Sequence, residues 1–98
     1  MKADEILQAA LNAMKERGSQ NGYDHKEERS AGKIARMMNA KTGGNNTDVD
    51  AWRWLLTLKE ARLENQIQNG SDPTDTVIDL VAYAALMGEA ILAGRKNE

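Results

Sequence analysis

Acidic residues interrupt the apolar segments in the second half of the chain. Asp79 lies within the apolar stretch 77–84, and Asp75 precedes it by one helical turn. In an earlier segment, Glu60 falls on the main apolar side and Glu64 follows four residues later. An unpaired carboxylate among apolar side chains costs several kcal/mol, so Asp79 needs a metal ion, a basic partner or its own proton.

The turn at residues 68–73 is short, so the segments before and after it are expected to run antiparallel. That arrangement would bring Glu60 and Glu64 close to Asp79 and Asp75. Four converging carboxylates repel one another, and a hard divalent cation such as Mg²⁺ relieves this because it prefers oxygen ligands. The spacing therefore predicts an Mg²⁺ site that could hold a nucleotide's phosphates and activate a water molecule. In the alternative interpretation, Glu60 and Glu64 point to solvent, and Asp75 complements the positive end of its helix.

Basic residues near these carboxylates have two interpretations. Lys59 and Arg62 lie beside Glu60, and either could form a salt bridge with Asp79 that organises the bundle without a ligand. Alternatively, they could bind phosphate groups, arginine as a bidentate fork and lysine as a point charge. The sequence alone favours the structural salt bridge.

Three polar, glycine-containing breaks divide the chain into four segments with the apolar spacing of amphipathic helices. The predicted helices span residues 3–17, 24–41, 48–68 and 73–93, and residues 94–98 form a flexible tail. Thr47 with Asp50 three residues later predicts the start of the third helix, and Asp72 followed by proline predicts the start of the fourth. Because phenylalanine is absent and β-branched residues are few, residues 1–98 are expected to form one all-α domain.

The third and fourth predicted helices are apolar over more than one stripe, which is typical of helices at the centre of a bundle or in a subunit interface. We therefore expect a four-helix bundle-like fold with these two helices as an antiparallel hairpin at its centre, in an oligomer that completes the core. Trp52 and Trp54 point to different sides of the third helix. Trp52 is expected in the core, and Trp54 at an interface or against a base.

The composition excludes several classes of protein. The absence of cysteine excludes disulfide scaffolds, cysteine-based zinc sites and thiol catalysis. A net charge of −2 predicts no general affinity for nucleic acids or anionic membranes. Charges at Lys2, Asp4 and Glu5 argue against a signal peptide, and no uncharged run is long enough to span a bilayer. A soluble, cytoplasmic protein is expected.

Several short motifs, in this order, resemble a group of small phage and prophage proteins. They are Gly22-Tyr23-Asp24, Glu28-Arg29-Ser30, Leu58-Lys59-Glu60-Ala61-Arg62, and Asp75 through Asp79 with Val81-Ala82-Tyr83-Ala84-Ala85-Leu86. That group is similar to the MazG-like, all-α nucleoside triphosphate pyrophosphohydrolases, and the resemblance covers about residues 22–89. It implies an all-α bundle that is dimeric or higher, with a nucleotide as ligand and Mg²⁺ held by acidic side chains from adjacent helices.

The resemblance also implies roles for individual residues. The acidic metal site would comprise Glu28, Glu60, Glu64 and Asp79, with Asp75 as a weaker match. Glu60 and Asp79 would be catalytic, and the ligand-binding residues would be Glu28, Arg29, Lys59, Arg62 and Tyr83. The family pairs acidic residues three apart, whereas Ala31 follows Glu28 and Thr76 precedes Asp79 at that spacing. The sequence therefore leaves open whether the chain hydrolyses its ligand.

Two functions remain as hypotheses. In the first, a phage-type, MazG-like protein binds a nucleotide or nucleotide-derived molecule in the host cytoplasm. If catalytic, it would use metal-activated water to cleave the α–β phosphoanhydride and release pyrophosphate. In the second, the chain is a non-catalytic, oligomeric interaction or anti-defence protein that acts on a host protein or sequesters a signalling nucleotide.

Overall fold

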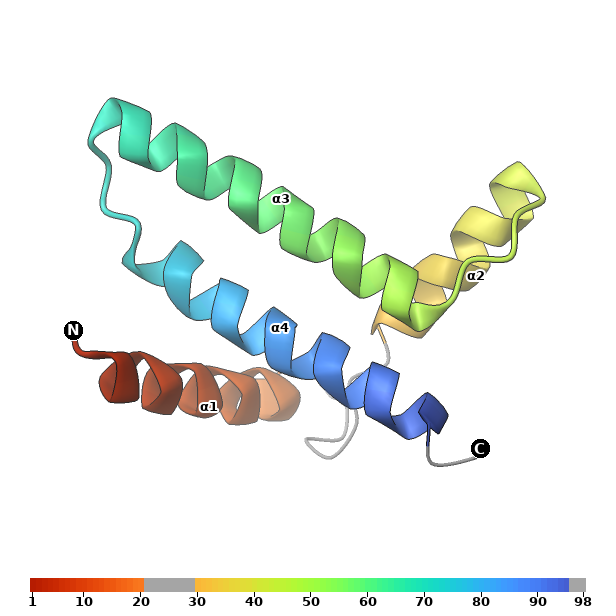
Figure 1. Ribbon diagram of the computed structural model, residues 1–98, viewed down its shortest axis with the longest axis horizontal. Coiled ribbons are helices and arrows are strands. Elements are labelled where there is room, and N and C mark those ends of the chain that lie inside the picture. Colours follow the sequence, from red (N-terminus) through yellow and green to blue (C-terminus); the bar gives the residue numbers. More distant parts are fainter. Residues whose placement is uncertain (21–29, 96–98) are drawn as a thin grey trace.

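The computed structural model describes residues 1–20 and 30–95, and within them it contains four α-helices and no strand (Figure 1). The helices are α1 (Ala3–Gln20), α2 (Ser30–Thr42), α3 (Asp48–Asn69) and α4 (Thr74–Arg95). The all-α prediction is confirmed. Residues 24–29, predicted to begin the second helix, lie outside the described residues. Helix α1 continues past Gly18, where the sequence predicted its end, because a helical glycine costs only about 1 kcal/mol relative to alanine.

Polar side chains mark the helix ends. At the start of α3, the Asp50 carboxylate accepts a hydrogen bond from the Thr47 backbone N–H at 2.8 Å, as a capping box requires. Helix α3 ends at Gly70, whose φ of 76° is left-handed and favours glycine. Before α4, Asp72 accepts hydrogen bonds from the hydroxyl and the backbone N–H of Thr74, which hold the pKa of Asp72 below its ordinary value. The predicted start of α3 is confirmed, and α4 begins at Thr74, one residue after its predicted start.

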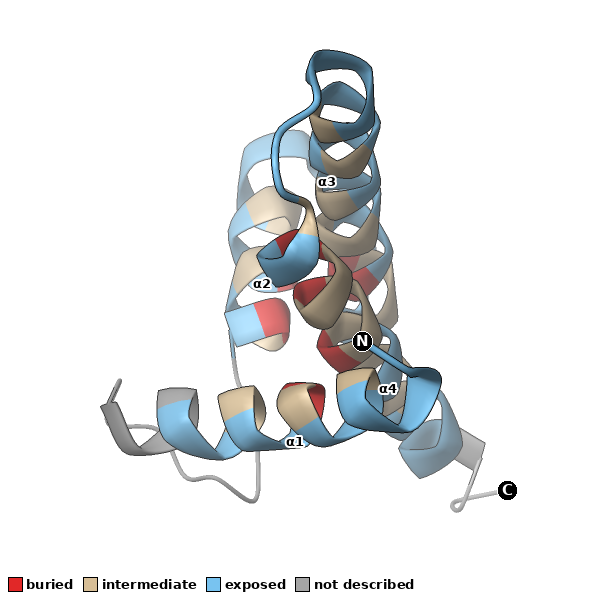
Figure 2. Cartoon of the chain, turned by 90° about the vertical axis from the view of Figure 1, so that its left-hand side faces the viewer, coloured by how far each residue is buried: buried red, intermediate tan, exposed pale blue. Residues whose placement is uncertain are grey.

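Two of the four helices form a central pair, and each of the other two packs against one member of it. Helices α3 and α4 run antiparallel beside each other, α1 packs against α4, and α2 packs against α3 (Figure 1). The buried positions of the helices face one another in the interior, and the outer surfaces are exposed (Figure 2). The predicted antiparallel hairpin at the centre is therefore confirmed.

Trp52 is the largest side chain of the core. It is 4% exposed and lies in a cluster with Ala31 and Ala35 of α2 and its neighbour Ala51. The alanines let α2 approach α3 closely, so the indole fills the space between α2, α3 and α4. Trp54, by contrast, is 39% exposed. The placement of Trp52 in the core is confirmed.

The interior of the described chain is small. Its buried apolar residues are five alanines and one tryptophan: Ala10, Ala31, Ala35, Ala51, Trp52 and Ala82. Large apolar side chains are exposed instead, and they include Leu7, Leu11, Met37, Leu58, Ile67 and Leu92. The single chain therefore leaves much of its apolar surface in contact with water.

Helix α4 is long and apolar enough, by length and composition, to cross a bilayer over residues Thr74–Gly94. Core helices of soluble proteins pass the same test. Helix α4 carries Asp79 in this stretch and packs against both α3 and α1, so its packing is compatible with a soluble protein.

The Asn39 side chain bridges the connection between α2 and α3. The Asn39 carboxamide oxygen accepts a hydrogen bond from the Asn46 backbone N–H at 2.7 Å, and its amide group donates to the Asn46 carbonyl at 2.9 Å. Gly43, with φ of 74°, allows the chain to turn after α2. Asn39 thus ties the start of α3 to the end of α2.

Candidate functional site

The polar centre of the helical hairpin is an ion pair between α3 and α4. The Lys59 Nζ lies 2.8 Å from the Asp79 Oδ2, and each side chain is only 12% exposed. Lys59 projects from the side of α3 that faces α4, and Asp79 lies on the buried side of α4. The predicted salt bridge of Asp79 with Lys59 or Arg62 is confirmed for Lys59, whereas Arg62 is exposed.

Two aromatic rings extend this centre along the interface. Tyr83 follows Asp79 by one turn of α4, and the Lys59 Nζ lies 5.7 Å from the centroid of the Tyr83 ring, within cation–π range. The ring of Trp52 lies 5.6 Å from that of Tyr83 at an interplanar angle of 54°. These contacts link the buried ion pair to the core around Trp52.

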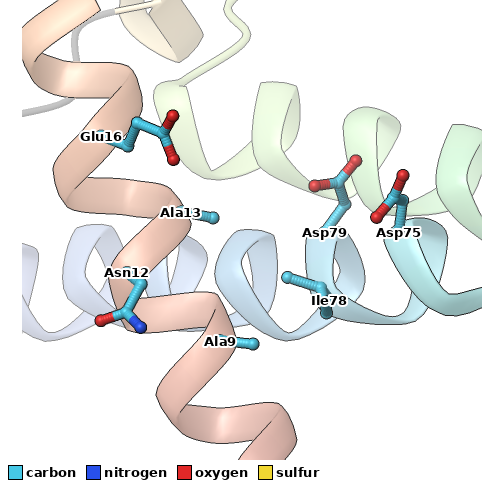
Figure 3. Close-up of a pocket in the computed structure, with 7 residues that line it drawn as sticks. All are labelled: Ala9, Asn12, Ala13, Glu16, Asp75, Ile78 and Asp79. Carbon is cyan, nitrogen blue, oxygen red and sulfur yellow. The ribbon is translucent and has the colours of Figure 1, made fainter.

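A pocket of about 520 Å³ lies between α1 and α4 (Figure 3). Its α4 wall includes Asp75 and Asp79, one helical turn apart, together with Ile78. Its α1 wall is formed by Ala9, Asn12, Ala13 and Glu16. Asp79 therefore lines the pocket and also pairs with Lys59 of α3.

The α1 side of this pocket is the part that the sequence reasoning missed. The apolar residues of the first helix have simple amphipathic spacing, which predicts a helix that packs on the bundle and indicates no functional role for it. The signal was the pair of polar residues Asn12 and Glu16, four apart and therefore on one face of the helix.

The acidic residues of α3 do not join Asp79. Glu60 and Glu64 are exposed, and the Glu64 Oε1 accepts a hydrogen bond from the Gln68 side chain at 3.4 Å. The physical reason is the position of Lys59. Successive residues of a helix point about 100° apart, so Glu60 points away from α4 when Lys59 points towards it. The expected position of Glu60 on a buried face is therefore corrected to an exposed one.

Other residues implied by the resemblance are only partly placed. Glu28 and Arg29 lie outside the described residues. Asp75 is exposed but lines the pocket with Asp79. Within residues 1–20 and 30–95, no three acidic or histidine side chains come together as a group that could hold a metal ion. The described part of the site thus offers the Asp75–Asp79 pair as oxygen donors.

Chemically, the pocket combines carboxylate groups from two helices with apolar side chains. It favours a cation or a cation-bearing ligand, and it disfavours an anion that arrives without a counterion. No protein-family model, curated protein or solved structure matches this chain.

Proposed function

We propose that this protein binds a nucleotide or nucleotide-derived molecule together with Mg²⁺ in the pocket between α1 and α4. The observation that carries the proposal is that Asp75 and Asp79, two of the acidic residues that the MazG-like resemblance implies, line one pocket. At about 520 Å³, the pocket is within the usual range of about 300–1,000 Å³ for small-molecule sites.

The donor set in this pocket fits magnesium. Mg²⁺ keeps several waters and is commonly held by one or two carboxylates plus substrate phosphates, so a large protein cage is unnecessary. Asp75 and Asp79 would supply the protein oxygens, and the ligand's phosphates would supply others. Because the pocket wall is acidic, a phosphate group would bind there only with its metal ion, which makes nucleotide binding depend on Mg²⁺.

Lys59 acts on this site through Asp79. Its ammonium group holds one oxygen of the carboxylate and thereby restrains the rotamer of Asp79 at the pocket wall. The Tyr83 ring stacked near Lys59 restrains the lysine in turn. Lys59 is therefore a positioning residue for the proposed metal ligand.

Binding is proposed rather than hydrolysis. A hydrolytic mechanism that uses Glu60 beside Asp79 would need both carboxylates at one site, whereas Glu60 is exposed on α3 and is not among the residues that line the pocket. If the wild-type chain released pyrophosphate from a nucleoside triphosphate and Glu60→Gln lost this activity, an enzymatic function would replace this proposal.

A thermal-shift screen tests the proposal with nucleoside mono-, di- and triphosphates, each with Mg²⁺ and with a chelator. We expect at least one nucleotide to raise the melting temperature only when Mg²⁺ is present. Asp75→Asn should abolish this shift without unfolding the chain, since Asp75 is exposed. Glu64→Gln is the matched control, because Glu64 is also exposed but does not line the pocket. No shift with any nucleotide, or an equal shift in both variants, would contradict the proposal.

A second candidate function is that of an interaction protein without a small-molecule ligand. Two observations favour it: Lys59 neutralises Asp79 without any ligand, and large apolar side chains are exposed on several helices. In that case the ion pair only stabilises the bundle, and a host protein is the target. A chain that shows no nucleotide-dependent shift would point to this function.

A further inference from the structure

Helix α1 is attached to the described part of the chain through α4 alone. Within residues 1–20 and 30–95 it packs against neither α2 nor α3, and it forms one edge of the bundle beside α4 (Figure 1). The hydrophobic cluster around Trp52 is built from α2, α3 and α4, and none of its described members comes from α1. Helix α1 therefore lies outside the core that holds the other three helices together.

The surface that α1 buries against α4 is small. Among residues 3–16, one side chain is buried and four are half-buried: Ala10, and Ile6, Ala9, Ala13 and Met14. Three of these five are alanines, which have little apolar area to remove from water. Because hydrophobic stabilisation is roughly proportional to the apolar area that is buried, this contact holds α1 only weakly.

The pocket weakens the same contact. A space of about 520 Å³ lies between the two helices, with Ala9 and Ala13 on the α1 side and Ile78 on the α4 side. Atoms that line a space have no neighbours across it, so α1 and α4 lose van der Waals contacts there. The pocket thus lies in the interface that attaches α1.

We propose that α1 is a movable wall of this pocket, which leaves α4 as a unit while the other three helices stay folded, and which a bound nucleotide holds in place. Elements with few buried apolar contacts open at a lower free energy than the core does. A helix that leaves its partner also loses most of its helical stability, because that stability comes from packing its apolar face.

The closing step rests on the proposed function. A nucleotide held with Mg²⁺ at Asp75 and Asp79 can contact Asn12 and Glu16 only while α1 is in place, since these residues line the opposite wall (Figure 3). A ligand that needs both walls binds only the closed form, and mass action then lowers the population of the open form. The opening of α1 itself requires no ligand.

Hydrogen exchange of the full chain without nucleotide tests the opening. We expect the amides of residues 6–14 to exchange at least about tenfold faster than those of residues 52–59 and 79–83, which surround Trp52 and the Lys59–Asp79 ion pair. Equal exchange free energies in the two sets would overturn the proposal, because α1 would then open only when the whole chain unfolds.

Ala10→Glu gives an independent readout of the same opening. It puts a charged group at a position that is 3% exposed, so α1 should leave α4. In amide spectra, residues 6–14 should move to random-coil positions while the Trp52 indole signal is unchanged. Leu7→Glu is the matched control, since Leu7 is 61% exposed on the same helix, and α1 should remain in place. Unfolding of the whole chain in Ala10→Glu, or α1 in place in both variants, would overturn the proposal.

Closure is tested with the Mg²⁺ complexes of the mono-, di- and triphosphates of adenosine, guanosine, cytidine and uridine. A nucleotide at a free concentration 100 times its Kd should slow the exchange of residues 6–14 about 100-fold. Binding seen by calorimetry without this slowing would overturn closure and leave the proposed function standing. Absence of binding by all of them would overturn both closure and the proposed function, whereas the opening stands or falls on the measurements without nucleotide.

Discussion

The Lys59 ammonium group and the Asp79 carboxylate, 20 residues apart in sequence, are joined at 2.8 Å across the α3–α4 interface. Both side chains are only 12% exposed, so each charge has lost much of its hydration. The attraction between the two charges compensates for that loss. The pair fixes the register of the two central helices, since a shift of either helix would separate the charges. It also sets the orientation of Asp79 at the pocket wall.

Loss of either charge should destabilise the bundle. Lys59→Met removes the ammonium group that contacts the nearly buried Asp79 carboxylate, and we expect a loss of about 3 kcal/mol in the free energy of unfolding. The measurement is urea denaturation followed by circular dichroism. The double variant Lys59→Met with Asp79→Leu should be more stable than the sum of the single losses predicts, because it removes both charges. Additive losses would show that the two side chains do not interact.

The two tryptophans should differ sharply in their effect on stability. Trp52→Ala removes the largest core side chain, which is 4% exposed, and should cost about 3–5 kcal/mol. Trp54→Ala, at a position 39% exposed, should cost about 1 kcal/mol. Urea denaturation of both variants tests the difference. Equal losses would contradict the placement of Trp52 as the centre of the core.

The hydrogen bonds by which Asn39 joins the end of α2 to the start of α3 can be tested by substitution of Asn39. Asn39→Ala removes the acceptor and the donor that hold Asn46, so the free energy of unfolding should fall by about 1–3 kcal/mol. Asn39→Asp keeps the acceptor for the Asn46 backbone N–H and should lose less. The exposed Asn45 is the control, and Asn45→Ala should have little effect. A loss of stability for Asn45→Ala as large as for Asn39→Ala would show that the Asn39–Asn46 hydrogen bonds do not account for the effect.

The cap of α4 should make stability depend on pH. The hydrogen bonds from Thr74 lower the pKa of Asp72 in the folded chain below its ordinary 3.8. Its stabilising contribution is therefore fully present above pH 3.8 and is lost as the pH falls through the lower folded value. Asp72→Ala should lower the melting temperature near neutral pH, and the difference from wild type should shrink in strong acid. A difference that is constant between these conditions would contradict a charged cap.

Local patterns in the sequence were enough to predict the helices and their central pairing. The Thr47–Asp50 and Asp72 caps and the polar breaks at residues 42–46 and 69–73 depend on residues close in sequence, and they agree with the structure, whereas α1 continues past the predicted break at Gly18. The basic partner of Asp79 could also be predicted from the sequence, because few basic residues of α3 lie near it. These features follow from helix geometry and burial alone.

The details of the site needed the tertiary structure. A helix that is apolar over more than one stripe leaves its rotation undecided, so the sequence could not show that Lys59, rather than Glu60, faces α4. The pocket is lined by residues from 9–16 and from 75–79. The spacing of apolar residues within one helix does not show which distant helix covers its face. Asn12 and Glu16 were missed for this reason.

Nuclear magnetic resonance provides the most direct test of the proposed ligand site, since the 98-residue chain suits backbone amide spectra. The chain is titrated with nucleoside triphosphates in Mg²⁺, and again with a chelator. We expect saturable shifts of the amides of residues 12–16 and 75–79 that require Mg²⁺, while residues 43–46 remain unchanged. Shifts absent for every nucleotide, or confined to residues away from α1 and α4, would contradict it.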